Sequence, residues 1–129
     1  MTKKITRRQA LLAASAAVFL PVANVQGSAP NISPSTVFSH GVASGDPDSS
    51  SVVIWTRISG SEGALDTEWR VGTDERMFNI VATGNVQTDD SKDYTVKVVV
   101  KELDPGQQYF YDFRARGESS VIGRTKTLP

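Results

Sequence analysis

The chain of 129 residues is long enough for one domain of ordinary size. It contains no cysteine, which excludes a disulfide framework, thiol catalysis and cysteine metal sites. Its formal net charge is zero, but the first thirty residues hold four basic side chains and no acid. The remainder has ten basic and fourteen acidic residues and lacks the basic footprint that binding to nucleic acid requires.

Residues 1–29 have the order of a secretory signal. A basic start is followed by the apolar residues 11–23 and then by small and polar residues. Arg7 and Arg8 directly precede the apolar run, which resembles a twin-arginine export signal read by the export machinery. This run is shorter than the roughly 20 apolar residues that span a bilayer, so no stable membrane anchor is expected. We therefore predict a helical signal peptide and a periplasmic or extracellular location.

Residues 30–35 are polar and predict a linker, and residues 36–129 predict the folded domain. The apolar residues of this domain are mainly Val, Ile, Tyr, Phe and Trp, which favour strands. Seven short strands separated by turn residues are expected at 36–43, 51–58, 65–72, 80–86, 94–103, 108–116 and 119–128. This spacing predicts an all-β, fibronectin type III-like or immunoglobulin-like β-sandwich.

The expected strand at 51–58 is apolar on both faces. Side chains alternate along a strand, so Val53 and Trp55 share one face while Val52, Ile54 and Thr56 share the other. We therefore expect a central strand with cover on both sides. The tryptophans at positions 55 and 69 are predicted core residues.

A local motif supports this fold class. Leu103, Pro105 and Tyr109 have the Leu-x-Pro-x-x-x-Tyr spacing that resembles the tyrosine corner of fibronectin type III domains. The ring is expected to fill the edge of the core, and its hydroxyl needs a polar partner. We expect that partner to be the backbone of the corner just before Tyr109.

His40, Ser44 and Asp46 are the residue types of a catalytic triad, but they lie too close together along an extended strand and turn. No Gly-x-Ser-x-Gly elbow is present, so a structural or interfacial role is favoured for the histidine. Residues 41–45 are rich in glycine but lack the Gly-Lys-Ser/Thr ending of a phosphate loop. Asp46 and Asp48 follow and would repel a phosphate, so a turn is predicted there.

Two charged clusters have structural explanations. Acids that could hold calcium weakly lack the spacing and glycine of a calcium loop, so a solvated turn is favoured for Asp89, Asp90 and Asp93. A basic strip could be formed by Arg114, Arg116 and Arg124, but a charged outer face is the simpler interpretation of these arginines. We therefore predict no catalytic, cofactor-binding or metal-binding residue in this chain.

Three stretches carry a resemblance to a known family: FSHGVASGDP at 38–47, VVIWTRI at 52–58 and GRTKTLP at 123–129. Together with the twin-arginine signal, they resemble the start of the alkaline phosphatase D (PhoD-like) family of phosphatases and phosphodiesterases. The resemblance covers essentially the whole chain.

The resemblance implies that this β-sandwich precedes a metallophosphatase domain, which binds iron and calcium and hydrolyses phosphate esters. None of the positions that bear the family's catalytic residues exists here. The expectation is a non-catalytic accessory domain, a fragment or truncated product that packs against the missing catalytic domain and is inactive alone. The alternative is a free-standing secreted binding or adhesion module of fibronectin type III type, because sandwiches host many functions.

Overall fold

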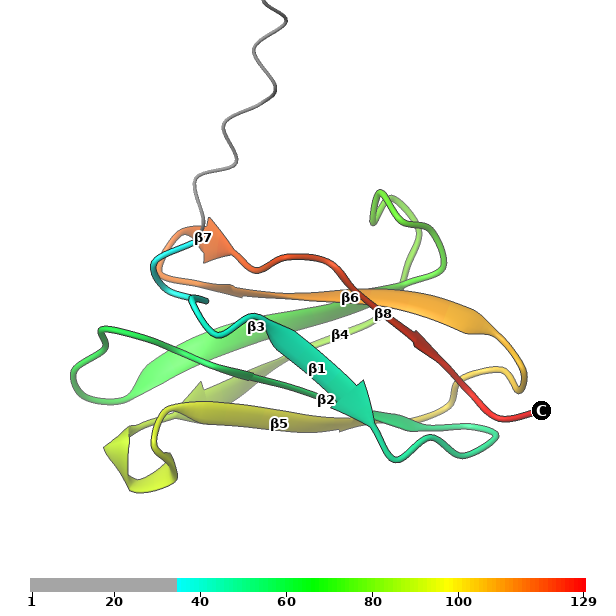
Figure 1. Cartoon of the computed structure of the whole chain (residues 1–129), viewed down its shortest axis with the longest axis horizontal. Helices are drawn as coiled ribbons and strands as arrows, with labels where there is room; N and C mark the ends of the chain where they lie inside the picture. Colours follow the sequence, from blue (N-terminus) through cyan, green and yellow to red (C-terminus); the bar gives the residue numbers. More distant parts are fainter. Residues whose placement is uncertain (1–34) are drawn as a thin grey trace, which may run out of the picture. The chain divides into compact units, whose positions relative to one another are not determined.

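The structure is a computed structural model that describes residues 35–129. The predicted signal peptide at 1–29 and nearly all of the predicted linker lie outside the described residues. The described part is built from β-strands that form two antiparallel sheets, as Figure 1 shows. The all-β fold expected from the sequence is confirmed.

The first sheet has three strands, in the order β1 (Val42–Gly45), β2 (Val52–Arg57) and β5 (Thr95–Val100). The second has five: β4 (Ile80–Thr88), β3 (Leu65–Gly72), β6 (Gln108–Ala115) and β7 (Glu118–Ser119) in that order, with β8 (Gly123–Lys126) also paired to β6. A short 3₁₀ helix, η2 (Asp90–Lys92), connects β4 to β5. Packing of the two sheets makes the domain a β-sandwich.

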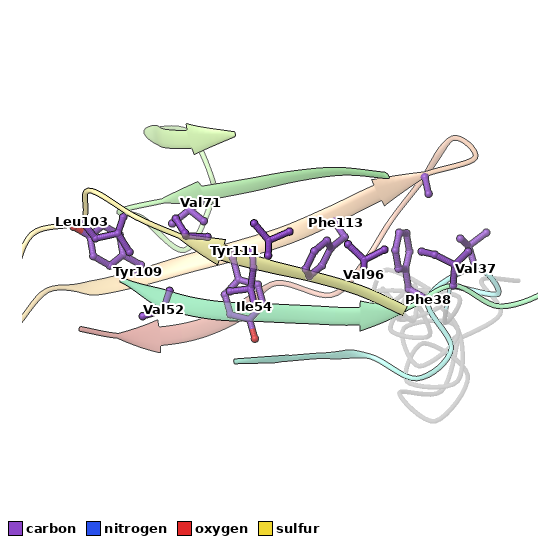
Figure 2. Close-up of a cluster of buried hydrophobic side chains, with 14 residues drawn as sticks. Val37, Phe38, Val52, Ile54, Val71, Val96, Leu103, Tyr109, Tyr111 and Phe113 are labelled. Carbon is purple, nitrogen blue, oxygen red and sulfur yellow. The ribbon is translucent and has the colours of Figure 1, made fainter. Parts of the chain in front are cut away.

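The core lies between the sheets and is filled by alternate residues of facing strands (Figure 2). From β2, Val52 and Ile54 are fully buried, and from β6, Tyr111 and Phe113 are almost inaccessible. The two aromatic rings meet edge to face, with centroids 6.3 Å apart and an interplanar angle of 85°. This geometry suits the quadrupoles of the rings and adds to the apolar burial.

The first expected strand, 36–43, is wrong at both ends. Residues 36–40 form turns, and β1 begins only at Val42. Gly41 has a φ of +73°, in the left-handed region, and its N–H donates to the carbonyl oxygen of Phe38 at 3.0 Å. The Glu118 carboxylate also holds this segment, accepting from the Ser35 hydroxyl at 2.6 Å. This contact spans 83 residues, so local alternation could not reveal it.

The later strands agree better with the sequence, except that the expected strand at 119–128 is two strands, β7 and β8. Strand β3 has the expected bounds, and β4 lies at the edge of its sheet. Strand β4 is longer than the expected 80–86, because it runs through Gly84 to Thr88. The Trp69 indole lies so close that a Cβ at position 84 would be 2.8 Å from it. Gly84 therefore provides space for the neighbouring ring and does not break the strand.

The predicted tyrosine corner is confirmed. Tyr109 is only 2% exposed, and the backbone N–H of Asp104 donates to its hydroxyl oxygen at 2.8 Å. Leu103, at the start of the motif, is also buried in the core. The motif therefore closes the loop between β5 and β6 and satisfies a polar group at the edge of the core.

The predicted cover over both faces of β2 is only half right. The strand is central in its sheet, and its Val52, Ile54 and Thr56 face is buried. Trp55, on the opposite face, is 53% exposed, so its prediction as a core residue is wrong. Trp69 is partly buried and packs against the core, in keeping with its prediction.

Candidate functional site

The outer face of the three-stranded sheet carries exposed apolar side chains in neighbouring rows. In one row across the sheet, Ala43, Trp55 and Lys97 are register partners; in the next, Val53 pairs with Val99. Val99 is 50% exposed, close to the exposure of Trp55. We call these five residues the Trp55 face. An apolar patch of this kind on a folded domain indicates a contact surface.

Two hollows flank the Trp55 ring on this face. The first, of about 210 Å³, lies toward the turn between β1 and β2 and is lined by Ser44, Gly45, Asp46, Val53, Trp55 and Lys97. The second, of about 290 Å³, lies toward the other end of the strands and is lined by His40, Gly41, Val42, Ala43, Trp55, Thr56, Arg57 and Thr95. Both hollows are open, so they suit projecting side chains of a partner better than an enclosed small molecule.

A charged cluster borders the second hollow. The Arg57 guanidinium donates from Nη2 to Asp93 Oδ1 at 3.0 Å, and its Nη1 lies 2.9 Å from His40 Nε2. The hydrogen bond from Arg57 and the charge of that arginine lower the pKa of Asp93. His40 therefore has the structural contact that the sequence favoured for it.

Comparison with known proteins identifies the domain. The family model of the PhoD-like phosphatase N-terminal domain matches residues 24–129. The chain belongs to this PhoD-like family. It is 40% identical over 109 residues to alkaline phosphatase D of Bacillus subtilis (strain 168). The aligned stretch covers 78% of this chain and 18% of that protein. The chain thus spans about a fifth of the length of this relative.

Solved structures agree with the family assignment. A structure of PhoD superposes with a TM-score of 0.70 at 39% identity, covering 78% of this chain and 21% of the other. The sensor domain of the anti-sigma factor RsgI4 from Pseudobacteroides cellulosolvens superposes with a TM-score of 0.55 at 14% identity, covering 68% and 91%. The second match shows a shared fold alone.

Within this PhoD-like N-terminal domain, the triad residue types do not converge. Ser44 is a register partner of Ile54 on the inward side of β1, whereas His40 is exposed and contacts Arg57. Asp46 lies in the turn after β1 with a φ of 47°. No hydrogen bond joins these three side chains within residues 35–129.

The glycine-rich segment 41–45 is a strand and not the predicted turn. Only Gly41 belongs to a turn, and β1 follows it at once, so no helix N-terminus is present to hold a phosphate. The turn itself comes later, where Asp48 Oδ1 accepts from the backbone N–H groups of Ser50 and Ser51, both at 2.6 Å. These bonds lower the pKa of Asp48.

Two of the three acids after β4 have structural contacts. Asp89 caps η2 by accepting from the Ser91 N–H at 3.0 Å, and this serine lowers the pKa of Asp89. Asp93 is paired with Arg57 as described. No group of three His, Asp or Glu side chains that could hold a metal ion was found in residues 35–129. Asp89 therefore caps this turn, and Asp93 ties it to β2 through Arg57.

The three arginines do not form a basic strip. Arg114 is the register partner of Glu68, and Arg124 is the partner of Phe110, with the acid Asp112 between them along β6. Arg116 instead reaches the loop before β3, where it donates to the Gly60 carbonyl at 2.6 Å. The charges of this face are therefore interspersed.

Sequence reasoning missed two features, the exposure of Trp55 and an ion pair between Arg70 and Asp112. Asp112 is 3% exposed although it shares the outer face of β6 with Phe110 and Arg114, and Arg70 Nε donates to its Oδ1 at 2.9 Å. This hydrogen bond raises the pKa of Arg70. The pair spans 42 residues, and only the register of β3 with β6 could have revealed it.

Among the described residues, no helix has the length and apolar character needed to cross a membrane.

Proposed function

We propose that this chain is the non-catalytic N-terminal module of an exported PhoD-like enzyme that hydrolyses phosphate esters. The observation that carries the proposal is the 40% identity to alkaline phosphatase D over a stretch that makes up only 18% of that enzyme. Three acidic side chains support it further: Asp89 caps a turn, Asp93 pairs with Arg57, and Glu118 holds the entry segment.

The proposal assigns catalytic metals to the part of the enzyme beyond this domain. The resemblance implies iron and calcium, which require several converging carboxylate, imidazole or carbonyl ligands. In residues 35–129 no three His, Asp or Glu side chains converge as such a site needs, and Asp89, Asp93 and Asp112 have hydrogen-bond partners within the domain. The catalytic domain of the same enzyme is the partner against which this module packs.

We assign residues 1–29 to a twin-arginine signal peptide, 30–35 to a linker and 36–129 to the sandwich. The support is the pair Arg7 and Arg8 before a short apolar run. Exchanging both arginines for lysine keeps the charge and should abolish export, measured as loss of the protein from the periplasmic or secreted fraction. Exchanging Lys3 and Lys4 for arginine is the matched control and should leave export intact; export of the double-lysine variant would refute the assignment.

Reading the coding sequence past the codon of Pro129 tests the proposed parent enzyme. A continuation rich in Asp, His and Asn, in frame or shifted by a nucleotide, is expected for a phosphatase that binds metals. An unrelated neighbouring gene would overturn the proposal and favour the free-standing binding module.

A further inference from the structure

We infer that the Trp55 face is the surface on which the phosphatase catalytic domain packs. This inference rests on the proposed function and names the contact surface within it. The face combines a half-exposed tryptophan with Val99, which is about equally exposed, in adjacent rows of one sheet. Tryptophan is the residue type most enriched among those that dominate the energetics of protein interfaces.

The outer face of the five-stranded sheet differs in character. It carries the Arg70 and Asp112 ion pair, and Glu68 and Arg114 stand opposite each other in the next row. These charges have partners of opposite sign within the domain itself. The Trp55 face has a single charged residue, Lys97, which forms no ion pair within the described part of the chain.

The path of the chain indicates which partner binds to the Trp55 face. The backbone N–H of Leu128 donates to the carbonyl oxygen of Asp48 at 2.9 Å, which places the last described residues beside the turn between β1 and β2 (Figure 1). That turn contains Asp46, which lines the first hollow beside Trp55. In the relatives, about four fifths of the protein lies outside the matched region. A domain joined at Pro129 therefore starts close to this face, and its attachment to the same chain gives it a high effective concentration there.

The two hollows define the chemistry of the contact. Each has a mainly apolar wall formed by the Trp55 ring, so the partner is expected to place an apolar side chain on either side of this ring. Lys97 lines the first hollow, and a carboxylate of the partner would complement its charge. Trp55 then becomes the buried centre of an interface with charged residues at its rim.

Hydroxyl-radical footprinting with mass spectrometry tests the inference. The probes are the full chain alone and the full chain joined through Pro129 to the part of Bacillus subtilis alkaline phosphatase D that follows the matched region. Labelling of Trp55 should fall about fivefold or more on joining, because the centre of a protein interface excludes water. Val81, which is 50% exposed on the other sheet, is the control and should be labelled equally in both proteins.

A Trp55→Ala variant of the joined protein provides the second measurement. The ring is half exposed, so the domain should stay folded, while labelling of Val99 should rise toward its level in the chain alone. Unchanged labelling of Trp55 with protection elsewhere on the domain would overturn the inference and leave the proposed function standing. If no residue of the domain were protected on joining, the result would contradict both the inference and the proposed function. Protection of Trp55 in the chain alone that grows with concentration would assign the face to a second copy and overturn the inference.

Discussion

Replacing Phe113 by alanine is expected to lower the free energy of unfolding by about 3–5 kcal/mol, the usual cost of truncating a buried phenylalanine. The side chain is 0% exposed and packs edge to face on Tyr111 between the two sheets. The substitution removes apolar burial, loses the ring contact and leaves a cavity. Since domains of this size have a total stability of roughly 5–15 kcal/mol, much of the variant could be unfolded near its working temperature.

Urea unfolding followed by far-ultraviolet circular dichroism measures this loss. Phe78→Ala is the matched control, because Phe78 is 81% exposed on the hairpin between β3 and β4. Its truncation should change stability by no more than about 0.5 kcal/mol. Equal losses for the two variants would show that Phe113 is not at the centre of the core.

Removing one member of the Arg70 and Asp112 pair is also expected to lower the free energy of unfolding strongly. Asp112→Ala should cost about 3 kcal/mol, because it leaves the guanidinium half of a buried pair without its acceptor. The two side chains are only 15% and 4% exposed, so water compensates poorly for the loss. Thermal and urea unfolding of the single variant measure the effect.

The double variant Arg70→Met with Asp112→Leu is the control for this pair. Apolar side chains of similar size avoid an unpaired charge, so most of the lost stability should return. A double variant as unstable as Asp112→Ala alone would contradict this account of the ion pair. It would then be the shape of the two side chains, and not their charge, that the sheet requires.

The alternation of apolar and polar residues along the chain predicted most of the fold, because buried and exposed positions of the strands alternate in the same way. Strand β3 has the expected bounds since Thr67 and Val71 face the core while Asp66 faces solvent. Alternation shows which residues share a face but not whether anything covers that face. For this reason it placed Trp55 in the core, although the face of β2 that carries it is uncovered in the described domain.

The distance along the chain between partners decided which contacts could be predicted. The hydrogen bond to the Tyr109 hydroxyl comes from Asp104, five residues away, and a local motif was enough to find it. The hydrogen bonds from Ser35 to Glu118 and from Arg70 to Asp112 join residues far apart in the sequence. They depend on sheet register and three-dimensional packing, which no local pattern contains.

The central claim is that this domain serves a phosphatase without being the catalyst. Its most direct test is hydrolysis of p-nitrophenyl phosphate and bis(p-nitrophenyl) phosphate by the purified chain with iron and calcium added. We expect no rate above buffer, while alkaline phosphatase D of Bacillus subtilis, assayed in parallel, hydrolyses substrate. Turnover that co-purifies with the chain and is lost on chelation of the metals would contradict the claim.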